Sequence, residues 1–118
     1  GADSPDQVIG DVLAMVGLSG SEATYPRHLS RGERQRLAVA CILAMKPGLI
    51  ILDEPTTGLD EKESDRMMDL MLTLQKSGHT IIMVTHNMRI AEEYASRIIA
   101  MENGRVIGDY HNLKGRAS

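Results

Sequence analysis

Three side chains able to do chemistry stand at the ends of two apolar segments. The segment "LIILDEP" places Asp53 and Glu54 directly after four apolar residues, and "TIIMVTH" ends on His86. A buried carboxylate needs a partner, so we expect both acidic residues at the carboxyl end of the first strand, where open α/β sheets bind ligands. If the two strands are neighbours, Asp53, Glu54 and His86 converge on one edge of the sheet.

The two carboxylates suit two different tasks. Mg²⁺ typically binds one or two carboxylates together with waters and substrate phosphates. The second carboxylate is then free to activate a water as general base, an effect of roughly 10²–10⁴ in rate. A pair of surface carboxylates at the start of a loop is the simpler alternative, but the apolar run before the pair and Pro55 after it favour the functional one. For His86, a satisfied polar side chain and a catalytic one both stay open.

A helix start at residues 28–36, "HLSRGERQR", is a candidate anion site. Ser30 and Glu33 have the spacing of a capping box, which satisfies the first turn of the helix without a ligand. Gly32 permits another group to approach the backbone closely, and the free N–H groups and dipole of a helix tip suit a phosphate. Positive charge would be added by Arg31, Arg34 and Arg36. Capping alone and phosphate binding both remain open.

The chain has no phosphate-cradling loop of the usual kind. A P-loop needs the pattern G-x-x-x-x-G-K-[ST], and the sequence has eleven glycines but no Gly-Lys dipeptide. The sequence therefore predicts a Mg²⁺ carboxylate, a candidate base and a candidate phosphate-binding helix tip, without the loop that would complete them.

Helices alternate with strands along the chain. Capping signals and apolar stripes predict helices that start at Ser4, Ser30, Asp60 and His86 or Asn87, and that end near Gly17, Met45, Gly78 and Ser96. An apolar run predicts a strand at residues 49–52 that is covered on both faces, and a second, near-continuous apolar run predicts a strand at residues 80–85. Asn103-Gly104 predicts a hairpin of strands 97–101 and 105–110. We expect an α/β fold with a mainly parallel sheet flanked by helices and a C-terminal hairpin.

Finer expectations concern burial and caps. The segment Leu37–Met45 is apolar on every face and should be buried, with Cys41 as a small buried hydrophobe. Glu63 lies three residues after Asp60 and should close a capping box with it. The methionines of the third helix should fill the core, and the polar residues at the C-terminus should fray.

Length and composition indicate one ordinary globular domain of 118 residues. A net charge of -3 and an aromatic content of 3% argue against a dedicated nucleic-acid binder, which usually shows a basic surplus and stacking aromatics. A single cysteine excludes an intrachain disulfide. No apolar run approaches the ~20 residues that span a bilayer, and no signal peptide is evident. We therefore expect any link to a membrane to run through a partner protein.

Four motifs, taken in order, resemble the second half of an ATP-binding cassette (ABC) transporter nucleotide-binding domain. "LSRGERQRLAVA" resembles the signature motif, usually written LSGGQ, "LIILDE" the Walker B motif, "TTGLD" the D-loop and "VTH" the switch-histidine motif. The resemblance runs from Val8 to Tyr110 and is nearest to the energy-coupling-factor or cobalt-type importers. The family's adenine-stacking aromatic, P-loop and Q-loop glutamine have no counterpart. The resemblance implies that the chain is a fragment in three parts. Residues 1–28 would be a remnant of the helical subdomain with a connector, residues 29–110 a portion of the ABC ATPase core, and residues 111–118 a polar tail.

The resemblance implies a role for each residue at the strand ends. Asp53 would help to hold Mg²⁺. Glu54 would be the general base that activates water. His86 would contact the γ-phosphate of ATP and position the attack.

The same resemblance assigns roles at the helix tip and in the D-loop. Ser30 and Gly32 would bind the γ-phosphate of ATP held on the partner subunit's P-loop, and Asp60 would lie at the dimer interface. Two residues depart from the family pattern: Arg31 stands where glycine is usual, and Glu33 where glutamine is usual. Glu33 puts a carboxylate near a triphosphate and should weaken that contact unless Arg31 offsets it.

The implied function is that of the ATP-binding and ATP-hydrolysing subunit of an ABC importer, which couples hydrolysis at a dimer interface to transport and uses ATP and Mg²⁺. Its partners would be a second ABC ATPase subunit, identical or different, and a transmembrane transport subunit at the cytoplasmic face of the cell membrane, with no nucleic acid. A soluble ABC ATPase is an alternative, although such proteins usually carry coiled-coil insertions or basic arms. As an isolated chain without a P-loop, the fragment is expected to be a catalytically inactive interaction module.

The family's sheet would also place the P-loop strand between the strand that precedes His86 and the strand at residues 97–101. Without it the fragment has a gap and unpaired strand edges, which are a known route to association. We expect the chain to close the gap by rearranging or by pairing with another copy.

Overall fold

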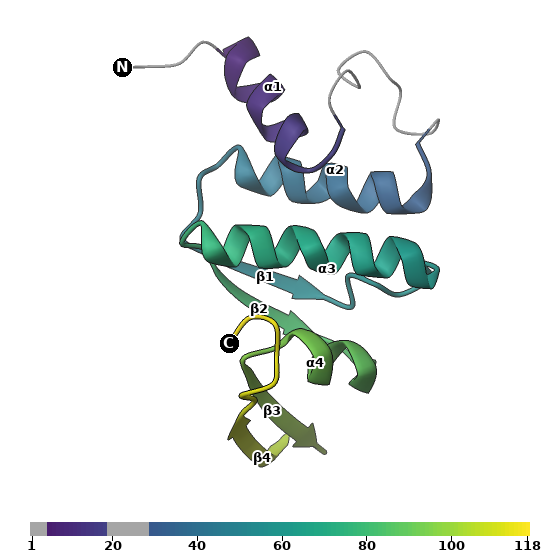
Figure 1. Cartoon of the computed structure of the whole chain (residues 1–118), viewed down its shortest axis with the longest axis vertical. Helices are drawn as coiled ribbons and strands as arrows, with labels where there is room; N and C mark the ends of the chain where they lie inside the picture. The colour runs from purple at the N-terminus through teal and green to yellow at the C-terminus, as the bar shows by residue number, and fades with distance from the viewer. Residues whose placement is uncertain (1–4, 19–28) are drawn as a thin grey trace.

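The computed structural model describes residues 5–18 and 29–118 (Figure 1). The elements are, in chain order, helix α1 (Pro5–Met15), helix α2 (Arg31–Leu43), strand β1 (Leu49–Asp53), helix α3 (Glu61–Lys76), strand β2 (Thr80–Val84), helix α4 (Met88–Tyr94), strand β3 (Arg97–Glu102) and strand β4 (Arg105–His111). The expected cap at Ser4 and most of the connector, residues 19–28, lie outside the described residues. The predicted α/β order of elements is confirmed.

Two separate two-stranded sheets form the β structure of the described residues. Strands β1 and β2 are parallel neighbours, with Asp53 opposite Val84, so the predicted adjacency is confirmed. Strands β3 and β4 form the predicted antiparallel hairpin. Asn103 and Gly104 at its turn have φ values of 51° and 75°, and two consecutive positive values are what a type I′ turn requires.

A gap separates the two sheets. Within residues 5–18 and 29–118, no strand joins β2 to β3. The chain therefore does not close the gap by pairing its own strands in a new way, and that part of the expectation is wrong. Closure by another copy stays a prediction.

The core lies on one face of the β1–β2 sheet. Helix α3 packs on this sheet, and α2 packs on α3 (Figure 1). The side chains of Ile50, Met67, Leu74 and Ile90 are no more than 1% exposed. Buried Met67, Met68 and Met71 on α3 confirm the expectation that its methionines fill the core.

The other face of the β1–β2 sheet is open, which corrects the expectation of cover on both faces. Ile51, Ile82 and Val84 are 62%, 49% and 51% exposed. An uninterrupted apolar run is typical of strands with helices on both faces, but α3 covers only one face here. The open face of the β1–β2 sheet is therefore an exposed apolar surface.

Two expectations about α2 are also wrong. The segment Leu37–Met45 is not buried throughout, because Met45, which lies two residues beyond the end of the helix at Leu43, is 82% exposed. Cys41 is exposed as well. The reason is that α2 is buried only along a stripe that includes Val39, Ala40 and Leu43, and the rest of the helix faces solvent.

The C-terminal residues are ordered against α4, so the expectation that they fray is wrong. The backbone N–H groups of Arg116 and Ala117 donate to the carbonyls of Glu93 and Tyr94, both at 2.9 Å. Gly115 is buried, and a Cβ at this position would overlap the carbonyl of Ala95. The polar composition of these residues predicted that they fray. Composition cannot reveal the backbone hydrogen bonds that attach them to α4.

None of the helices in the described ranges combines the length and apolar character needed to cross a membrane.

Candidate functional site

The carboxyl ends of β1 and β2 bring Glu54 beside β2. Asp53 is the last residue of β1, and the Glu54 N–H still donates to the Val84 carbonyl at 2.7 Å. Glu54 has a φ of 51°, in the left-handed region that a residue with a Cβ enters at a cost of about 1–2 kcal/mol. The chain therefore turns sharply at Glu54, and local strain of this kind is common at functional sites.

Glu54 and His86 are in contact, as the parallel pairing predicted. Glu54 Oε1 accepts a hydrogen bond from the His86 N–H at 3.1 Å and lies 3.5 Å from His86 Nε2. Glu54 Oε2 accepts a second hydrogen bond from the Thr57 hydroxyl, also at 3.1 Å. The Glu54 side chain is 28% exposed and that of His86 is 98% exposed. A fixed carboxylate and a freely accessible imidazole thus share one edge of the sheet.

Asp53 lies at the same edge, next to Glu54 in the chain. Because successive residues of a strand point to opposite faces, Asp53 shares the open face with Ile51. The residue is exposed. Among the described residues, no three His, Cys, Asp or Glu side chains are grouped to hold a metal ion.

The capping box at the start of α2 is confirmed. Ser30 Oγ accepts a hydrogen bond from the Glu33 N–H, and Glu33 Oε1 accepts one from the Ser30 N–H, both at 3.1 Å. The hydrogen bonds from the Ser30 backbone and side chain lower the pKa of the Glu33 carboxyl. The helix tip therefore holds a carboxylate that satisfies the Ser30 N–H without a ligand.

The neighbours of Gly32 come from α3. Any side chain at Gly32 would overlap the carboxylate of Glu63. That carboxylate accepts a hydrogen bond from Arg36 Nη1 at 2.9 Å. The Arg36 side chain is only 5% exposed, so the expectation that it adds charge to a phosphate site is wrong. Arg31 lies against Gly58 of the D-loop, where a Cβ would be 2.6 Å from Arg31 Cζ.

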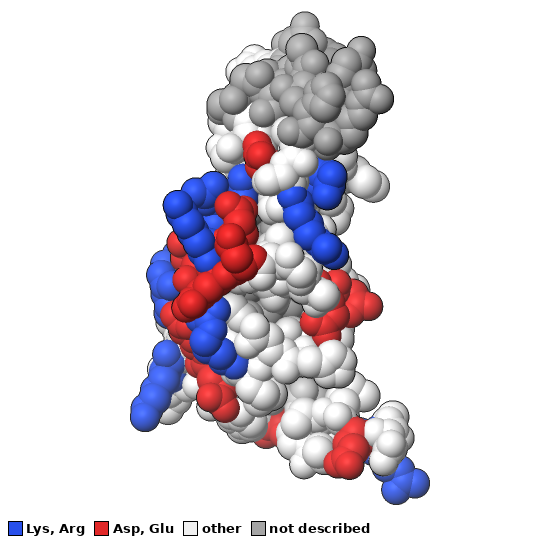
Figure 2. Space-filling model, turned by 90° about the vertical axis from the view of Figure 1, so that its right-hand side faces the viewer, with Lys and Arg blue, Asp and Glu red and all other residues white. Residues whose placement is uncertain are grey.

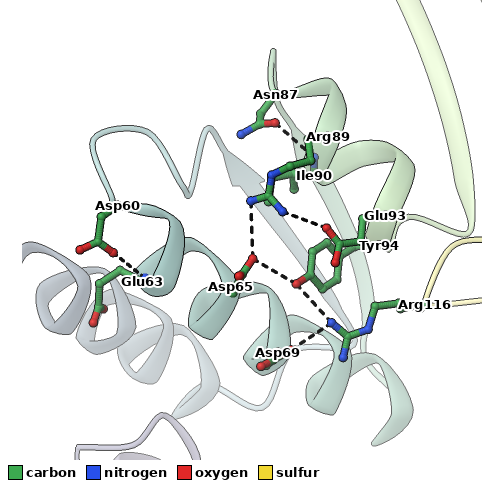
Figure 3. A network of polar contacts seen from close by, with 10 residues as sticks. All are labelled: Asp60, Glu63, Asp65, Asp69, Asn87, Arg89, Ile90, Glu93, Tyr94 and Arg116. Carbon is green, nitrogen blue, oxygen red and sulfur yellow. Dashed lines mark hydrogen bonds and ion pairs between the residues drawn. The ribbon is translucent and has the colours of Figure 1, made fainter.

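The caps of α3 and α4 lie at the loops that follow the two strands (Figure 3). Asp60 Oδ1 accepts a hydrogen bond from the Glu63 N–H at 2.7 Å, so Asp60 is the N-cap as predicted. The Glu63 side chain does not complete a capping box, because it is bound to Arg36 instead. Asn87, rather than His86, caps α4 through a bond from the Ile90 N–H at 3.2 Å.

A polar network between α3, α4 and the C-terminal residues was not predicted (Figure 3). We call it the α3–α4 network, and it consists of Asp65, Asp69, Arg89, Glu93, Tyr94 and Arg116. Arg89 contacts Asp65 at 3.5 Å and Glu93 at 2.9 Å. Only the Arg89–Glu93 pair has a signal in the sequence, the i,i+4 spacing. The network joins the helix after the D-loop to the helix after His86.

Tyr94 is the centre of this network. Its hydroxyl donates to Asp65 Oδ1 at 3.4 Å and accepts from Arg116 Nη1 at 3.2 Å. The Arg116 guanidinium lies 5.0 Å from the centre of the Tyr94 ring, within the range of a cation–π contact. Burial raises the pKa of the Tyr94 phenol. The C-terminal residues are thereby attached to α4 by side chains as well as by backbone.

Figure 2 shows the side of the molecule to which β1 and β2 point in Figure 1. Charged side chains of both signs crowd along one side of this view, beside a largely uncharged surface. On α3, the exposed charged residues include Glu61, Lys62, Arg66 and Asp69. Charges of opposite sign are therefore mixed on α3.

Comparison with known proteins agrees with this geometry. Residues 4–57 match the sequence profile of the ABC transporter family. A putative ABC transporter ATP-binding protein of Methanosarcina mazei is 64% identical over 100 residues, which are 85% of this chain and 20% of that protein. The energy-coupling factor transporter ATP-binding protein EcfA2 of Methanospirillum hungatei is 50% identical over 101 residues, which are 86% of this chain and 25% of that protein.

A solved structure gives the same result for the fold. It is a dimeric ATP-binding cassette in a post-hydrolysis state, bound to ADP and phosphate. Its TM-score is 0.77 at 34% identity, and the match covers 94% of this chain and 50% of that one. The resemblance to ABC transporter nucleotide-binding domains is thus confirmed: the chain is related to ABC transporter ATP-binding proteins, and its fold is part of a P-loop NTPase domain of the ABC ATPase type. The chain spans a fifth to a quarter of the two relatives named above.

Proposed function

We propose that this chain is part of the ATP-hydrolysing subunit of an ABC importer, which couples ATP hydrolysis at a dimer interface to transport. The observation that carries the proposal is the contact of Glu54 with His86 at the carboxyl ends of two parallel strands. The name of the M. hungatei relative supports transport of the energy-coupling-factor type, and the dimeric cassette with ADP and phosphate supports a dimer.

Glu54 is the general base in this proposal. Its carboxylate is held by the His86 N–H and the Thr57 hydroxyl, and it stays partly open to water. A carboxylate fixed in this way accepts a proton from the attacking water as the water oxygen bonds to the γ-phosphorus and the bond from that phosphorus to the β,γ-bridging oxygen breaks, so that ADP and phosphate are released. His86, fully accessible, donates a hydrogen bond to the γ-phosphate and so aligns it with that water.

Asp53 is the residue that would hold Mg²⁺. One exposed carboxylate at the end of a strand fits this ion, which usually takes one or two protein carboxylates together with waters and phosphate oxygens. When bound there, Mg²⁺ supplies positive charge that offsets the negative charge of the phosphates.

The helix tip and the D-loop serve the nucleotide of a partner subunit. Ser30 and Gly32 contact the γ-phosphate across the dimer interface, with Arg31 and Glu33 beside them, and Asp60 lies at that interface. The partner is a second ABC ATPase subunit, identical or different, and a transmembrane transport subunit holds both at the cytoplasmic face of the membrane.

The isolated chain is proposed to be inactive, because the sequence offers no P-loop to hold ATP next to Glu54. Turnover of ATP by the purified 118-residue chain, abolished by Glu54→Gln, would overturn this part. The open apolar face around Ile51 and Ile82 is then the surface that the rest of the domain covers.

Glu54→Gln in the complete subunit tests the proposal. The amide keeps the shape of the side chain but cannot take a proton, so we expect hydrolysis to fall by roughly 10²–10⁴ and an ATP-bound dimer to accumulate. Phosphate release and light scattering measure the two effects. Glu92→Gln, an exposed carboxylate on α4, is the matched control and should hydrolyse ATP normally. Full hydrolysis by Glu54→Gln would remove Glu54 as the base.

A further inference from the structure

A seam of side chains joins the first two turns of α2 to the segment that runs from Walker B through the D-loop. We call it the α2–α3 seam, and it consists of Arg31, Gly32, Gln35 and Arg36 on α2, with Pro55, Gly58 and Glu63 opposite. Gln35 Nε2 donates to the Pro55 carbonyl at 3.2 Å, and Arg31 lies against Gly58. The Arg36–Glu63 ion pair completes the seam at 2.9 Å.

Glu63 is the central residue of this seam. Its Oε2 pairs with Arg36, and its Oε1 lies 3.6 Å from Arg66 on the same helix. The same carboxylate fills the space beside Gly32, where any larger residue would overlap it. Its backbone N–H donates a hydrogen bond to Asp60 Oδ1, the N-cap of α3. One residue therefore contacts both the signature helix and the D-loop cap.

The surroundings of Arg36 indicate that the Arg36–Glu63 ion pair contributes little to the stability of the fold. Its side chain is 5% exposed, and among the described residues its buried Nε has no hydrogen-bond partner. A buried ion pair usually stabilises little more than an apolar pair of equal volume, and the best-attested use of such pairs is to specify one arrangement. The α2–α3 seam is therefore better explained as a set of contacts that fixes how α2 and α3 lie relative to each other than as a source of folding stability.

The arrangement that the seam specifies is the relative position of two helix tips. The starts of α2 and α3 lie on the same side of the molecule, the side to which β1 and β2 point (Figure 1). Ser30 caps the first of these helices and Asp60 the second. In the proposed function, both caps face the partner subunit.

We propose that Glu63 and Arg36 are positioning residues that hold the signature tip and the D-loop of one subunit as a single unit. This inference rests on the proposed function. It means that Ser30 and Asp60 reach the partner's nucleotide and interface together rather than independently. Neither Glu63 nor Arg36 contacts the nucleotide in this account. Their effect is on the position of residues that do.

The test uses the complete subunit with Glu54→Gln, in which ATP-bound dimers persist. Glu63→Gln is added to it, because the amide keeps the volume of the side chain but removes the charge that pairs with Arg36. We expect the ATP concentration for half-maximal dimer formation to rise by about tenfold to a hundredfold, the effect of misplacing a contact by about 1 Å. Binding of ATP to the monomer should stay unchanged. A thermal scan should show the variant still folded at the assay temperature, with a lower Tm because Arg36 loses its charged partner.

Glu61→Gln is the matched control, since it also removes an acidic residue from the first turn of α3 but has no place in the seam. Arg36→Lys is the second variant. It keeps a cation opposite Glu63, which protects the fold, but lacks the guanidinium geometry. It should shift dimer formation in the same direction as Glu63→Gln. The double variant should be no worse than the more affected single one, because the two residues act as a pair.

The outcomes separate this inference from the proposed function. If the Glu54→Gln subunit forms no ATP-dependent dimer, the proposed function fails and the inference fails with it. If it does form that dimer, but Glu63→Gln and Arg36→Lys dimerise at the same ATP concentration as Glu61→Gln, the positioning role is wrong and the proposed function stands.

Discussion

The α2–α3 seam and the α3–α4 network both attach a helix to α3, but they do so in different surroundings. In the seam, the Arg36 and Glu63 side chains are 5% and 24% exposed. In the network, those of Arg89 and Asp65 are 45% and 43% exposed, and those of Arg116 and Asp69 are 51% and 62% exposed. One attachment is a buried ion pair, and the other is a set of solvated ion pairs around a buried tyrosine.

The difference indicates which attachment is rigid. Exposed ion pairs contribute little because water screens them and their long side chains lose freedom. Removal of one partner from a buried pair leaves the other poorly solvated and costs several kcal/mol. The signature helix should therefore be fixed to α3, whereas α4 with His86 relies on its apolar contacts and on the backbone bonds of the C-terminal residues.

The largest expected effect comes from breaking the seam. Arg36→Leu should lower the free energy of local opening of α2 by about 3 kcal/mol, because Glu63, whose side chain is 24% exposed, loses its close partner and keeps only the longer contact with Arg66. Native-state hydrogen exchange of α2 amides in the complete subunit measures this. Arg34→Leu, an exposed change on the same helix, should have little effect. Equal exchange in the two variants would contradict the seam as a rigid attachment.

A smaller effect should follow from releasing the C-terminal residues from α4. Gly115→Ala puts a Cβ into the Ala95 carbonyl, and forced overpacking of this kind costs about 1–3 kcal/mol. The amides of Arg116 and Ala117 should exchange faster while α2 is unchanged. Gly108→Ala is the control, since its Cβ would meet only the Ala100 methyl, at 3.6 Å. Unchanged protection of Arg116 would count against this attachment.

The smallest effect concerns an ion pair outside both regions. Arg97 donates two hydrogen bonds to Asp109 across the β3–β4 hairpin, at 2.9 and 2.7 Å, and these lower the pKa of the Asp109 carboxyl. A lowered carboxyl pKa stabilises the fold above the ordinary carboxyl pKa, and this stability is lost as the pH falls through the lowered value. Arg97→Met should raise the pKa of Asp109 in an NMR titration, and Arg105→Met should not. An unshifted pKa in Arg97→Met would exclude Arg97 as the cause.

The strand-end site could be predicted from the sequence because its signals are local. Four apolar residues define β1, the next two residues must lie at its end, and parallel pairing brings His86 beside Glu54. The caps at Ser30 and Asp60 were also predictable, because capping depends on residues three apart.

The seam and the network could not be predicted, because their contacts join residues far apart in the chain. Arg36 and Glu63 are 27 residues apart, and an arginine on a helix otherwise predicts an exposed side chain. The open face of β1–β2 was missed for another reason. An apolar run shows which residues favour burial, but not whether a second layer is present to bury them.

A catalytic site shared between two subunits can be tested by mixing two inactive variants of the complete subunit. One carries Glu54→Gln, and the other carries Ser30→Asp, which keeps a good N-cap but places a carboxylate at the phosphate. In a mixed dimer, one site has both changes and the other has neither. We expect the mixture to hydrolyse ATP faster than either variant alone. Activity of the mixture no higher than that of the separate variants would contradict it.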